Sequence, residues 1–446
     1  MVRLTGSISR LQRHNILVIG DLLLDTYTIG KARRISPEAP VAVVQVIRED
    51  KLPGGAGNVI LNLISLGAGV IAIGRIGDDV PGAILKDALE KENVDVRGLF
   101  IQHGYPTPVK NRIIAENQQI VRVDHEKILP LPEMLEQQII ESLPGLMENI
   151  AAVAISDYSK GFLSRTLLSA VIEQAKLRKI PVVTDPKGVD FTKYHGTTII
   201  KPNLSEAYAA AGLLPDACLE MAAHKILQLA NAEILMVTRS EAGISVFHRN
   251  GERHDFPVTV REIKDVTGAG DTVLAVLTLA TASGLSIQEA SQLANVAAGI
   301  AIERFGCARI SLSELARRLF ESDVANKVFD AEHLLPLREA LRDRAYILLS
   351  LTGADGMTST IFSAIHHLAK DASRDLVIYL RDARLDEEFI QLLASIHDVK
   401  FIIVQGKDLV DVCHLIPPEE IYIVDGKKLT PYTGQVSGFM LNAYQT

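Results

Sequence analysis

The chain has 446 residues, 48% of them hydrophobic, and a formal net charge of −8. This length exceeds what one compact core usually holds, so we expect two domains, or one domain with a large appendage. The acidic balance argues against a nucleic-acid-binding protein, because such a protein needs a basic face to replace phosphate counterions. No nucleic-acid partner is therefore expected, and negative charge on a substrate must be met locally.

The first residues, Met1–Asn15, lack the apolar core of a secretory signal, and no apolar run reaches the ~18 residues that a membrane span requires. The three cysteines, Cys218, Cys307 and Cys413, are widely spaced and show no metal-ligand pattern. We expect them to be buried, unpaired thiols rather than disulfides. These features predict a cytoplasmic protein with no membrane partner.

Short apolar runs alternate with helical patterns over the first half of the chain. Such alternation predicts an α/β fold with a mostly parallel sheet covered by helices on both faces. The predicted strands are Ile16–Ile19, Val70–Ile76, Ala151–Ser156, Pro181–Thr184, Thr198–Ile200 and Ile234–Thr238. Ligands bind such sheets beyond the carboxyl ends of the strands. The candidate ligand-binding residues are therefore the polar residues that follow these and similar runs: Asp21, Asp25, Asp157, Asp185, Asn203, Thr238 and Asp271.

Two further segments, at residues 41–46 and 108–123, have the pattern of strands without intervening helices. We expect them to form a small sheet that projects from the main one. An ordinary hairpin packed on the core is the alternative.

The segment Lys264–Thr272 sets a carboxylate directly after three small residues at the start of a long apolar helix. The small residues, Gly268, Ala269 and Gly270, let backbone N–H groups approach an anion, and the helix dipole directs positive charge to the same point. Asp271 should repel a phosphate there, unless it accepts the proton of an attacking hydroxyl. The pattern predicts phosphoryl transfer with Asp271 as general base; the alternative is a glycine-rich turn that caps a core helix.

A second glycine-rich segment, Pro53–Asn58, opens another apolar helix. Gly54 and Gly55 clear a shelf on which a sugar can sit, and Asn58 offers an amide to its hydroxyls. Glycines before a helix more often form a plain turn, so the sugar interpretation depends on the pairing with Asp271.

Together the two segments resemble the signatures of ribokinase-like (PfkB) sugar kinases. The resemblance implies a parallel sheet sandwiched by helices, with a small β lid that covers the sugar and often forms a dimer interface. It also implies ATP and Mg²⁺ as cofactors. We therefore expect a homodimer through the lid.

Five further motifs resemble the kinase half of the bifunctional heptose enzyme of lipopolysaccharide synthesis, over a region from about Ile16 to Leu315. This resemblance implies phosphorylation of D-glycero-β-D-manno-heptose 7-phosphate at its anomeric hydroxyl. Another sugar or sugar phosphate, or a regulatory protein that only binds sugar and nucleotide, is the alternative. The motifs are Arg33–Pro40, Asn117–Gln119, Asp157–Gly161, Asp185–Gly188 and Lys201–Glu206.

A phosphorylated sugar agrees with the cations of the segments that should approach the site. An acidic protein has little reason to gather cations there unless an anion binds, although solvated surface charges are the alternative. By the resemblance, Asp25 holds sugar hydroxyls together with Asn58, and Asp21 is either a partner or a turn-stabilising carboxylate. The cations are Arg33, Arg34, Lys110, Arg112, Arg122, Lys160 and Lys187.

Asn203 and Glu206 are three residues apart at the start of a helix, so both can face one point. The resemblance implies that this pair organises Mg²⁺ through water, with Glu206 as the metal residue. A helix cap with a first-turn carboxylate is the alternative.

The remaining nucleotide candidates lie in two later segments. Residues 238–243 resemble the family's loop over the ATP phosphates, which makes Thr238, Arg239 and Gly243 candidates. Asn295 and Gly299 match positions that line the adenine pocket, although their segment also has the pattern of a tightly packed core helix.

A polar stretch near residues 321–327 precedes a second α/β series, so we expect a kinase domain at residues 1–323 and a smaller domain at residues 328–446. The series resembles a Rossmann-like nucleotidyltransferase domain. Its predicted order is helix Glu332–Arg344, strand Tyr346–Leu351, helix Met357–Lys370, strand Leu376–Leu380, helix Asp386–His397 and strand Lys400–Val404.

The first strand-to-helix turn of that domain, Thr352–Thr360, contains no histidine. Nucleotidyltransferases of this kind place a pair of histidines there to stabilise the transferring phosphate. His366 and His367 lie inside the next helix, where adjacent residues face different directions. We expect a degenerate, non-catalytic domain; a divergent active enzyme is the alternative.

Overall fold

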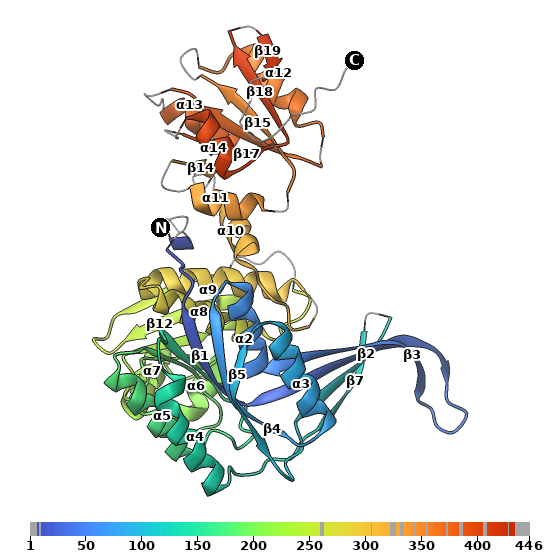
Figure 1. Ribbon diagram of the computed structural model, residues 1–446, viewed down its shortest axis with the longest axis vertical. Coiled ribbons are helices and arrows are strands. Elements are labelled where there is room, and N and C mark those ends of the chain that lie inside the picture. Colours follow the sequence, from blue (N-terminus) through green and yellow to red (C-terminus); the bar gives the residue numbers. More distant parts are fainter. Residues whose placement is uncertain are drawn as a thin grey trace. The chain divides into compact units, whose positions relative to one another are not determined.

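The chain folds as two compact units in the computed structural model (Figure 1). The first unit is Leu11–Ser311, and the second is Leu312–Thr446 together with Met1–Arg10. The sequence places the division later, at residues 323–328. The structure describes residues 7–8, 10–116, 118–258, 263–304, 306–321, 327–330, 334–342, 344–352, 356–371, 373–382, 387–404, 408–426 and 428–432.

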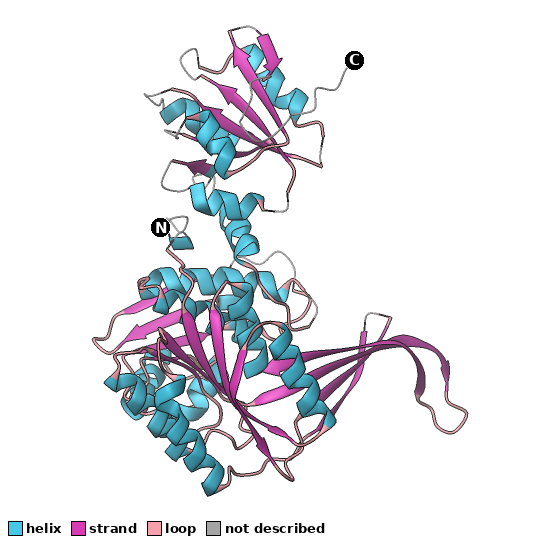
Figure 2. Cartoon of the chain, viewed as in Figure 1, coloured by secondary structure: helices cyan, strands magenta, loops and turns pink. Residues whose placement is uncertain are grey.

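The first unit is built on a nine-stranded sheet in the order β13-β12-β11-β10-β9-β8-β1-β4-β5 (Figures 1 and 2). Neighbouring strands from β5 to β11 are parallel, and β12 and β13 add an antiparallel edge. All six strands predicted for this sheet are present. The bounds are β1 Asn15–Gly20, β4 Gly69–Gly77, β5 Asp95–Gln102, β8 Ala152–Ser156, β9 Val182–Asp185, β10 Ile199–Ile200, β11 Ile234–Thr238, β12 Ile244–His248 and β13 Arg253–Phe256.

Helices cover both faces of this sheet, as its continuous apolar strands require. Helices α2, α8 and α9 pack against one another on one face, and α4 to α7 lie on the other (Figure 1). The bounds are α2 Ala56–Ser65, α3 Val80–Lys91, α4 Glu133–Leu146, α5 Arg165–Leu177, α6 Leu204–Ala211, α7 Leu219–Leu229, α8 Ala269–Ala282 and α9 Ile287–Ile302, with short 3₁₀ turns at Phe191–Tyr194 and Ser240–Ala242.

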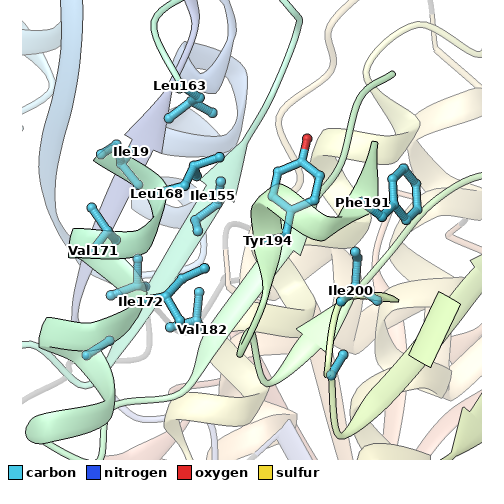
Figure 3. Close-up of a cluster of buried hydrophobic side chains, with 14 of the residues drawn as sticks. Ile19, Ile155, Leu163, Leu168, Val171, Ile172, Val182, Phe191, Tyr194 and Ile200 are labelled. Atoms are coloured by element: carbon cyan, nitrogen blue, oxygen red, sulfur yellow. The ribbon is translucent and has the colours of Figure 1, made fainter. Parts of the chain in front are cut away.

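A large hydrophobic core lies between the sheet and helices α4 to α7. Leu168, Val171 and Ile172 of α5 face Ile155 of β8 and Val182 of β9, and all five are buried (Figure 3). Each buried side chain of this size contributes about 1.5–3 kcal/mol relative to exposure. This packing fixes the carboxyl ends of the strands, where the candidate site residues follow.

A second, four-stranded sheet projects from the first unit in the order β3-β2-β6-β7 (Figure 2). It confirms the small projecting sheet, with longer strands than expected. Asp25 lies inside β2 and does not end a strand, which corrects the sequence interpretation; the mixed apolar and charged residues of β2 conceal the strand. The bounds are β2 Leu22–Ile35, β3 Ala42–Gly55, β6 Val109–Ala115 and β7 Gln118–His125.

The second unit contains a six-stranded sheet in the order β14-β17-β16-β15-β18-β19, parallel except for β19. Strands β16 and β17 lie on one side of β15 and β18 on the other, which is the order of a Rossmann-like sheet. The predicted turn residues Gly353, Ala354 and Asp355 lie outside the described residues. The bounds are α10 Leu312–Glu321, β14 Val328–Phe329, α11 Leu334–Leu341, β15 Tyr346–Leu351, α12 Ser359–Leu368, β16 Asp375–Leu380, α13 Glu387–Ser395, β17 Val399–Ile403, α14 Leu409–Leu415, β18 Glu420–Asp425 and β19 Lys428–Pro431.

The three cysteines are free, but their burial differs from the expectation. Cys413 is buried, Cys307 is half-buried and Cys218 is exposed. The prediction of three buried thiols is therefore wrong for two of them, because Cys218 begins helix α7 at the surface and Cys307 lies in a loop. Among the described residues, no helix combines the length and apolar character needed to cross a bilayer.

Candidate active site

Asp271 lies in the first turn of α8, and its carboxylate is buried between two donors. The Nδ2 of Asn58, from α2, donates to Oδ2 at 2.8 Å, and the hydroxyl of Tyr158, from the loop after β8, donates to Oδ1 at 2.7 Å. Burial raises the pKa of Asp271 to about 7, although both hydrogen bonds lower it. A carboxylate with this pKa is suited to accept a proton near neutral pH.

Gly268 is the residue before α8, and its backbone explains why glycine is needed there. Its φ is +77°, a left-handed conformation, and a Cβ at this position would lie 2.7 Å from Asn58 Nδ2. A side chain would therefore strain the turn and displace the donor to Asp271. Gly270 is different, because a Cβ there would meet nothing closer than 3.7 Å, at Lys201 Nζ.

Asn58 is itself fixed by Asn62, one turn later on α2. Asn62 Nδ2 donates to the backbone oxygen of Asn58 at 3.0 Å and to its Oδ1 at 3.2 Å. Because Oδ1 accepts from Asn62, the Nδ2 of Asn58 faces Asp271. Asn62 Oδ1 accepts from the N–H of Ile310, so the orienting residue is held as well.

The loop that carries Tyr158 is held by two buried charged side chains, Asp21 and Arg75. Asp21 Oδ2 accepts from the N–H groups of Tyr158 at 2.9 Å and Lys160 at 3.1 Å. Arg75 is almost fully buried and donates to the backbone oxygens of Lys160 at 2.5 Å and Leu129 at 2.6 Å. Burial raises the pKa of Asp21, and the neighbouring Asp157 raises it further. The strand-end carboxylate Asp21 therefore stabilises a loop, one of its two predicted roles.

A cavity of about 430 Å³ opens beside the N-terminus of α8. Small and polar residues of several elements meet there, as expected at the carboxyl ends of parallel strands. Six of the seven predicted nucleotide residues line it: Asn203, Glu206, Thr238, Gly243, Asn295 and Gly299. Ala269 and Gly270 line it too, so the predicted anion turn and the predicted nucleotide residues border one space.

Lys201 supplies a buried positive charge to this cavity. Its Nζ lies 3.0 Å from Oδ2 of Asp185, and its side chain is 3% exposed. Burial raises the pKa of Asp185 to about 6, although Lys201 lowers it. A fixed ammonium beside the N-terminus of a helix adds to the dipole's attraction for an anion.

Glu206 is fully engaged by neighbouring groups. Its Oε1 lies 2.5 Å from Lys187 Nζ, and its Oε2 accepts from the backbone N–H of Asn203 at 3.0 Å. Asn203 Oδ1 accepts in turn from the N–H of Glu206, which completes a capping box. Asn203 and Glu206 therefore form the helix cap that the sequence analysis gives as their alternative role. Lys187, which the sequence assigns to the sugar phosphate, lines the same cavity as the predicted nucleotide residues.

Arg239 is the one predicted nucleotide residue that is absent from the cavity wall. Its Nη2 lies 3.3 Å from Oδ1 of Asp255 and donates to the backbone oxygen of Ala242 at 3.1 Å. Asn295, on α9, donates to the backbone oxygens of Phe256 at 3.3 Å and Pro257 at 2.9 Å. Asn295 thereby ties α9 to the end of β13, and Val258, two residues after that strand, lines the cavity with Asn295.

Asp25 lies on β2 beside the glycine shelf and is paired with Arg112 of β6. A Cβ on Gly54 would lie 1.9 Å from Asp25 Oδ2, so glycine is needed for the carboxylate to reach this place. Gly55 has a φ of +58° and precedes α2. Cys307 Sγ lies 3.6 Å from the same oxygen, Asp25 Oδ2.

Lys110 and Lys160 are two cations of the lid side that approach Tyr158. Lys110 Nζ lies 5.7 Å from the centre of the Tyr158 ring, and Lys160 Nζ lies 2.7 Å from Glu126 Oε1. Burial lowers the pKa of Lys110, and the nearby Lys160 lowers it further. Two ammonium groups that repel each other, with the carboxylate of Glu126 paired to one of them, form a region that favours an anion.

The other predicted cations lie elsewhere. Arg33 and Arg34 are exposed near the far end of β2. Arg34 lies nine residues after Asp25 along the strand, which is about 30 Å at ~3.3 Å per residue. Arg122 is paired with Asp124 on the exposed strand β7. Within one chain, the structure therefore does not bring these arginines to the site.

The first unit coincides with a known family. Residues 13–314 match the pfkB family of carbohydrate kinases. The chain belongs to this family. Among curated relatives, the bifunctional protein HldE of Syntrophotalea carbinolica is 43% identical over 75% of this chain and 68% of its own length, and that of Geobacter metallireducens is 45% identical over 76% and 70%. The molecule is thus a carbohydrate kinase.

Solved structures show the same fold at lower identity. Ribokinase of Arabidopsis thaliana, complexed with ribose and ATP, has a TM-score of 0.56 and 19% identity, and covers 69% of this chain and 99% of its own. Phosphofructokinase-2 of Escherichia coli, in complex with potassium, has a TM-score of 0.56 and 20% identity, and covers 69% and 98%. The first unit therefore has the ribokinase-like fold that the sequence predicts.

Sequence reasoning missed two groups at the centre of the site, Tyr158 and Lys201. Both lie inside motifs that the sequence analysis quotes, Asp157–Gly161 and Lys201–Glu206. Both residues follow closely after predicted strands, which was the available signal. Sequence reasoning selected mainly carboxylates and amides at such positions and therefore passed over a tyrosine and a lysine. Asn62 gave no such signal, because it reads as one polar residue within an apolar helix.

Proposed function

We propose that the first unit transfers the γ-phosphoryl group of ATP to the anomeric hydroxyl of D-glycero-β-D-manno-heptose 7-phosphate. The observation that carries this proposal is the buried Asp271, held by Asn58 and Tyr158 beside the cavity at the start of α8. The similarity to HldE proteins at 43–45% identity and the resemblance to the heptose enzyme support the choice of sugar.

In this proposal the cavity holds ATP with its phosphates toward Gly268, Ala269 and Gly270. Backbone N–H groups of the first turn of α8 and the ammonium of Lys201 are the groups that attract the phosphates. Asn295 and Gly299 on α9, with Thr238 and Gly243, line the same space and are the proposed contacts of the nucleoside.

Asp271 acts on the acceptor in this scheme. The anomeric oxygen attacks the γ-phosphorus, its proton passes to the carboxylate of Asp271, and the bond between the γ-phosphorus and the oxygen of ADP breaks. A carboxylate has about four acceptor positions, so Asp271 keeps its bonds to Asn58 and Tyr158 while it receives the hydroxyl. Lys201 offsets the charge that develops on the departing ADP.

The sugar is proposed to lie between the lid and α2. Asp25 and Asn58 accept from and donate to its hydroxyls, and Arg112 holds Asp25 in place. Lys110 and Lys160 receive the 7-phosphate, because their mutual repulsion is relieved by a dianion. Gly54 and Gly55 leave the shelf open.

Magnesium fits the acidic wall of the nucleotide cavity. Mg²⁺ binds mainly through phosphates and water and needs only one or two carboxylates. Glu206 and Asp185 supply such oxygens there, although both are engaged by lysines in the free protein. The ion would shield the phosphate charge when bound.

The lid sheet is the proposed homodimer interface. Its strands carry exposed apolar side chains, and exposed apolar patches are typical of association surfaces. Arg34 then belongs to this interface and not to the sugar site of its own chain. The exposed apolar residues are Ile35, Val41, Val46, Ile47, Ile120, Val121 and Val123.

A substrate panel tests the proposal. The full chain with ATP and Mg²⁺ is offered heptose 7-phosphate, unphosphorylated heptose, ribose and fructose 6-phosphate, and ADP release is measured. We expect kcat/KM to be highest for heptose 7-phosphate by at least about 10-fold, which is the value of one charge-assisted phosphate contact. Equal use of the unphosphorylated sugar contradicts the sugar assignment, and no ADP release with any acceptor supports a protein that only binds.

A further inference from the structure

The β12–β13 hairpin carries a cluster of potential metal ligands that the kinase site does not use. The ligand atoms of His248, Glu252 and His254 all lie within 4.8 Å of one another. Both histidines are half-buried and Glu252 is exposed. Their rings are 5.9 Å apart and nearly perpendicular.

Strand register explains why these three residues meet. Val246 pairs with His254 and Phe247 with Arg253, so the next pair across the hairpin is His248 with Glu252. The backbone N–H of His248 donates to the oxygen of Glu252 at 2.9 Å. Residues two apart on a strand share a face, so the side chains of Glu252 and His254 lie on the same face of the hairpin. His248 is paired directly with Glu252 on the neighbouring strand, so its side chain lies on that face too. The hairpin thus places two imidazoles and a carboxylate on one face.

The polar groups of this face are incompletely satisfied within the described residues. His248 Nε2 is buried without a hydrogen-bond partner. Glu252 shows no ion pair in the part of the chain that the structure describes, and the adjacent Arg253 is instead bound to Glu220 and Asp255. An orphaned imidazole nitrogen next to an uncompensated carboxylate is a combination that a cation resolves.

Helix α9 supplies an outer partner to the cluster. The Nε2 atoms of Gln288 and His254 lie 3.5 Å apart, and exchanging the amide atoms of Gln288 places an acceptor oxygen there. An acceptor on one ring nitrogen fixes the tautomer and leaves the other nitrogen for a metal, as in most histidine-ligated sites. Gln292, one turn later on α9, also has a buried Oε1 without a partner.

We propose that His248, Glu252 and His254 bind a transition-metal ion, with Zn²⁺ as the preferred ion. Two imidazoles and a carboxylate suit Zn²⁺, which takes four ligands, so water fills the last position. The ion joins β12 to β13 at the closed end of the hairpin. The open end of the same hairpin, at Gly243 and Ile244, borders the nucleotide cavity, so the ion stabilises one wall of that cavity.

Zinc binding by the full chain tests this site directly. Chelator-treated protein is titrated with Zn²⁺ by calorimetry, and Co²⁺ is used as a spectroscopic probe. We expect one Zn²⁺ per chain and a Co²⁺ absorption band typical of a four-coordinate ion with nitrogen and oxygen ligands. The variants H248Q, E252Q and H254Q should each weaken binding by at least about 10-fold.

The matched control is His224→Gln. His224 lies on the neighbouring helix α7, is hydrogen-bonded to Gln228 and is not part of the cluster. This variant should bind Zn²⁺ as the wild type does. Glu252 is exposed, so E252Q should fold normally. If H248Q or H254Q fails to fold, the Zn²⁺ affinity of E252Q still tests the site.

A rise of the melting temperature with Zn²⁺ is expected for the wild type and for H224Q, and not for E252Q, because an ion that binds only the folded state stabilises it. The site is refuted if the wild type shows no stoichiometric Zn²⁺ binding in the micromolar range. It is equally refuted if E252Q and H254Q bind as tightly as H224Q does.

Discussion

At the scale of single residues, the proposed chemistry depends on how Asp271 is held. Burial is the main cause that raises its pKa, and the donors Asn58 and Tyr158 limit the rise to about 7. The base is therefore about half ionised at neutral pH and strong enough to accept a hydroxyl proton. Neither donor is free to turn away, because Asn62 orients Asn58 and Asp21 binds the loop of Tyr158.

The first prediction concerns pH. The ionised form of Asp271 is the active one, so kcat/KM should fall about 10-fold per pH unit below a pKa of about 7 and level off above it. Tyr158→Phe removes a hydrogen bond that lowers this pKa, so its acid limb should move to higher pH. ATP also titrates near this range, and the variant separates the two groups, because the titration of ATP is the same for both proteins. An acid limb that stays in place in Tyr158→Phe contradicts the assignment.

The raised pKa of Asp271 also makes stability depend on pH, in the opposite direction to activity. The folded pKa of Asp271 lies above its ordinary value of 3.8, so its protonated form favours the fold. This contribution is fully present below about 3.8 and is lost as the pH rises through about 7. Asp271→Asn should therefore melt at a higher temperature than the wild type at pH 8, and the difference should disappear near pH 4.

The second prediction separates two glycines of one turn. Gly268→Ala places a Cβ 2.7 Å from Asn58 Nδ2 in a left-handed backbone, so both activity and stability should fall, the latter by about 1–3 kcal/mol. Gly270→Ala meets no protein atom closer than 3.7 Å and lies in a helix, where alanine is favoured. It should keep or raise the melting temperature and still weaken ATP use, because its methyl group enters the cavity. Normal KM for ATP in Gly270→Ala means that the phosphates lie elsewhere.

At the scale of elements, different parts of the chain present charges to the two substrates. The lid strand β6 brings Lys110 toward Tyr158, and the loop after β9 brings Lys187 to the nucleotide cavity. Sequence reasoning grouped these lysines, because it could identify cations near strand ends but not the side of the site on which each loop falls. It also missed most of β2, whose charged residues obscure the apolar pattern of a strand.

The third prediction uses these two lysines as a matched pair. Lys110→Met should raise KM for heptose 7-phosphate by about 10-fold or more and leave KM for ATP nearly unchanged, because a charge-assisted contact is worth about 1.5–3 kcal/mol. Lys187→Met should do the reverse. Equal effects of both variants on both substrates contradict the division of the site into a sugar side and a nucleotide side.

At the scale of the whole molecule, two α/β units share one chain. The sequence correctly predicts both α/β units, because the alternation of apolar runs and helical patterns persists through each. The compact units divide at Ser311 and Leu312, so α10 belongs to the second unit, whereas the sequence predicts a boundary at residues 323–328. The strand ends at which Tyr158 and Lys201 lie can be predicted from the sequence, but their contacts with Asp271 and Asp185 cannot, since these depend on how the loops meet in the fold.

The second unit is proposed to be catalytically silent. Residues Thr352–Thr360 contain no imidazole, and neutral hydroxyls are weaker partners than protonated histidine for the charge that develops in nucleotidyl transfer. The full chain should therefore stop at the sugar bisphosphate.

The most direct measurement is phosphorus NMR of the full chain with ATP, Mg²⁺ and heptose 7-phosphate, run in parallel with Asp271→Asn. The wild type should produce ADP and a sugar with a second phosphate on its anomeric oxygen, with no pyrophosphate and no nucleoside-diphosphate sugar. The variant should bind ATP nearly as well and turn over roughly 100-fold more slowly or less. Near-normal turnover by Asp271→Asn, or phosphate on another oxygen of the sugar, would contradict the account.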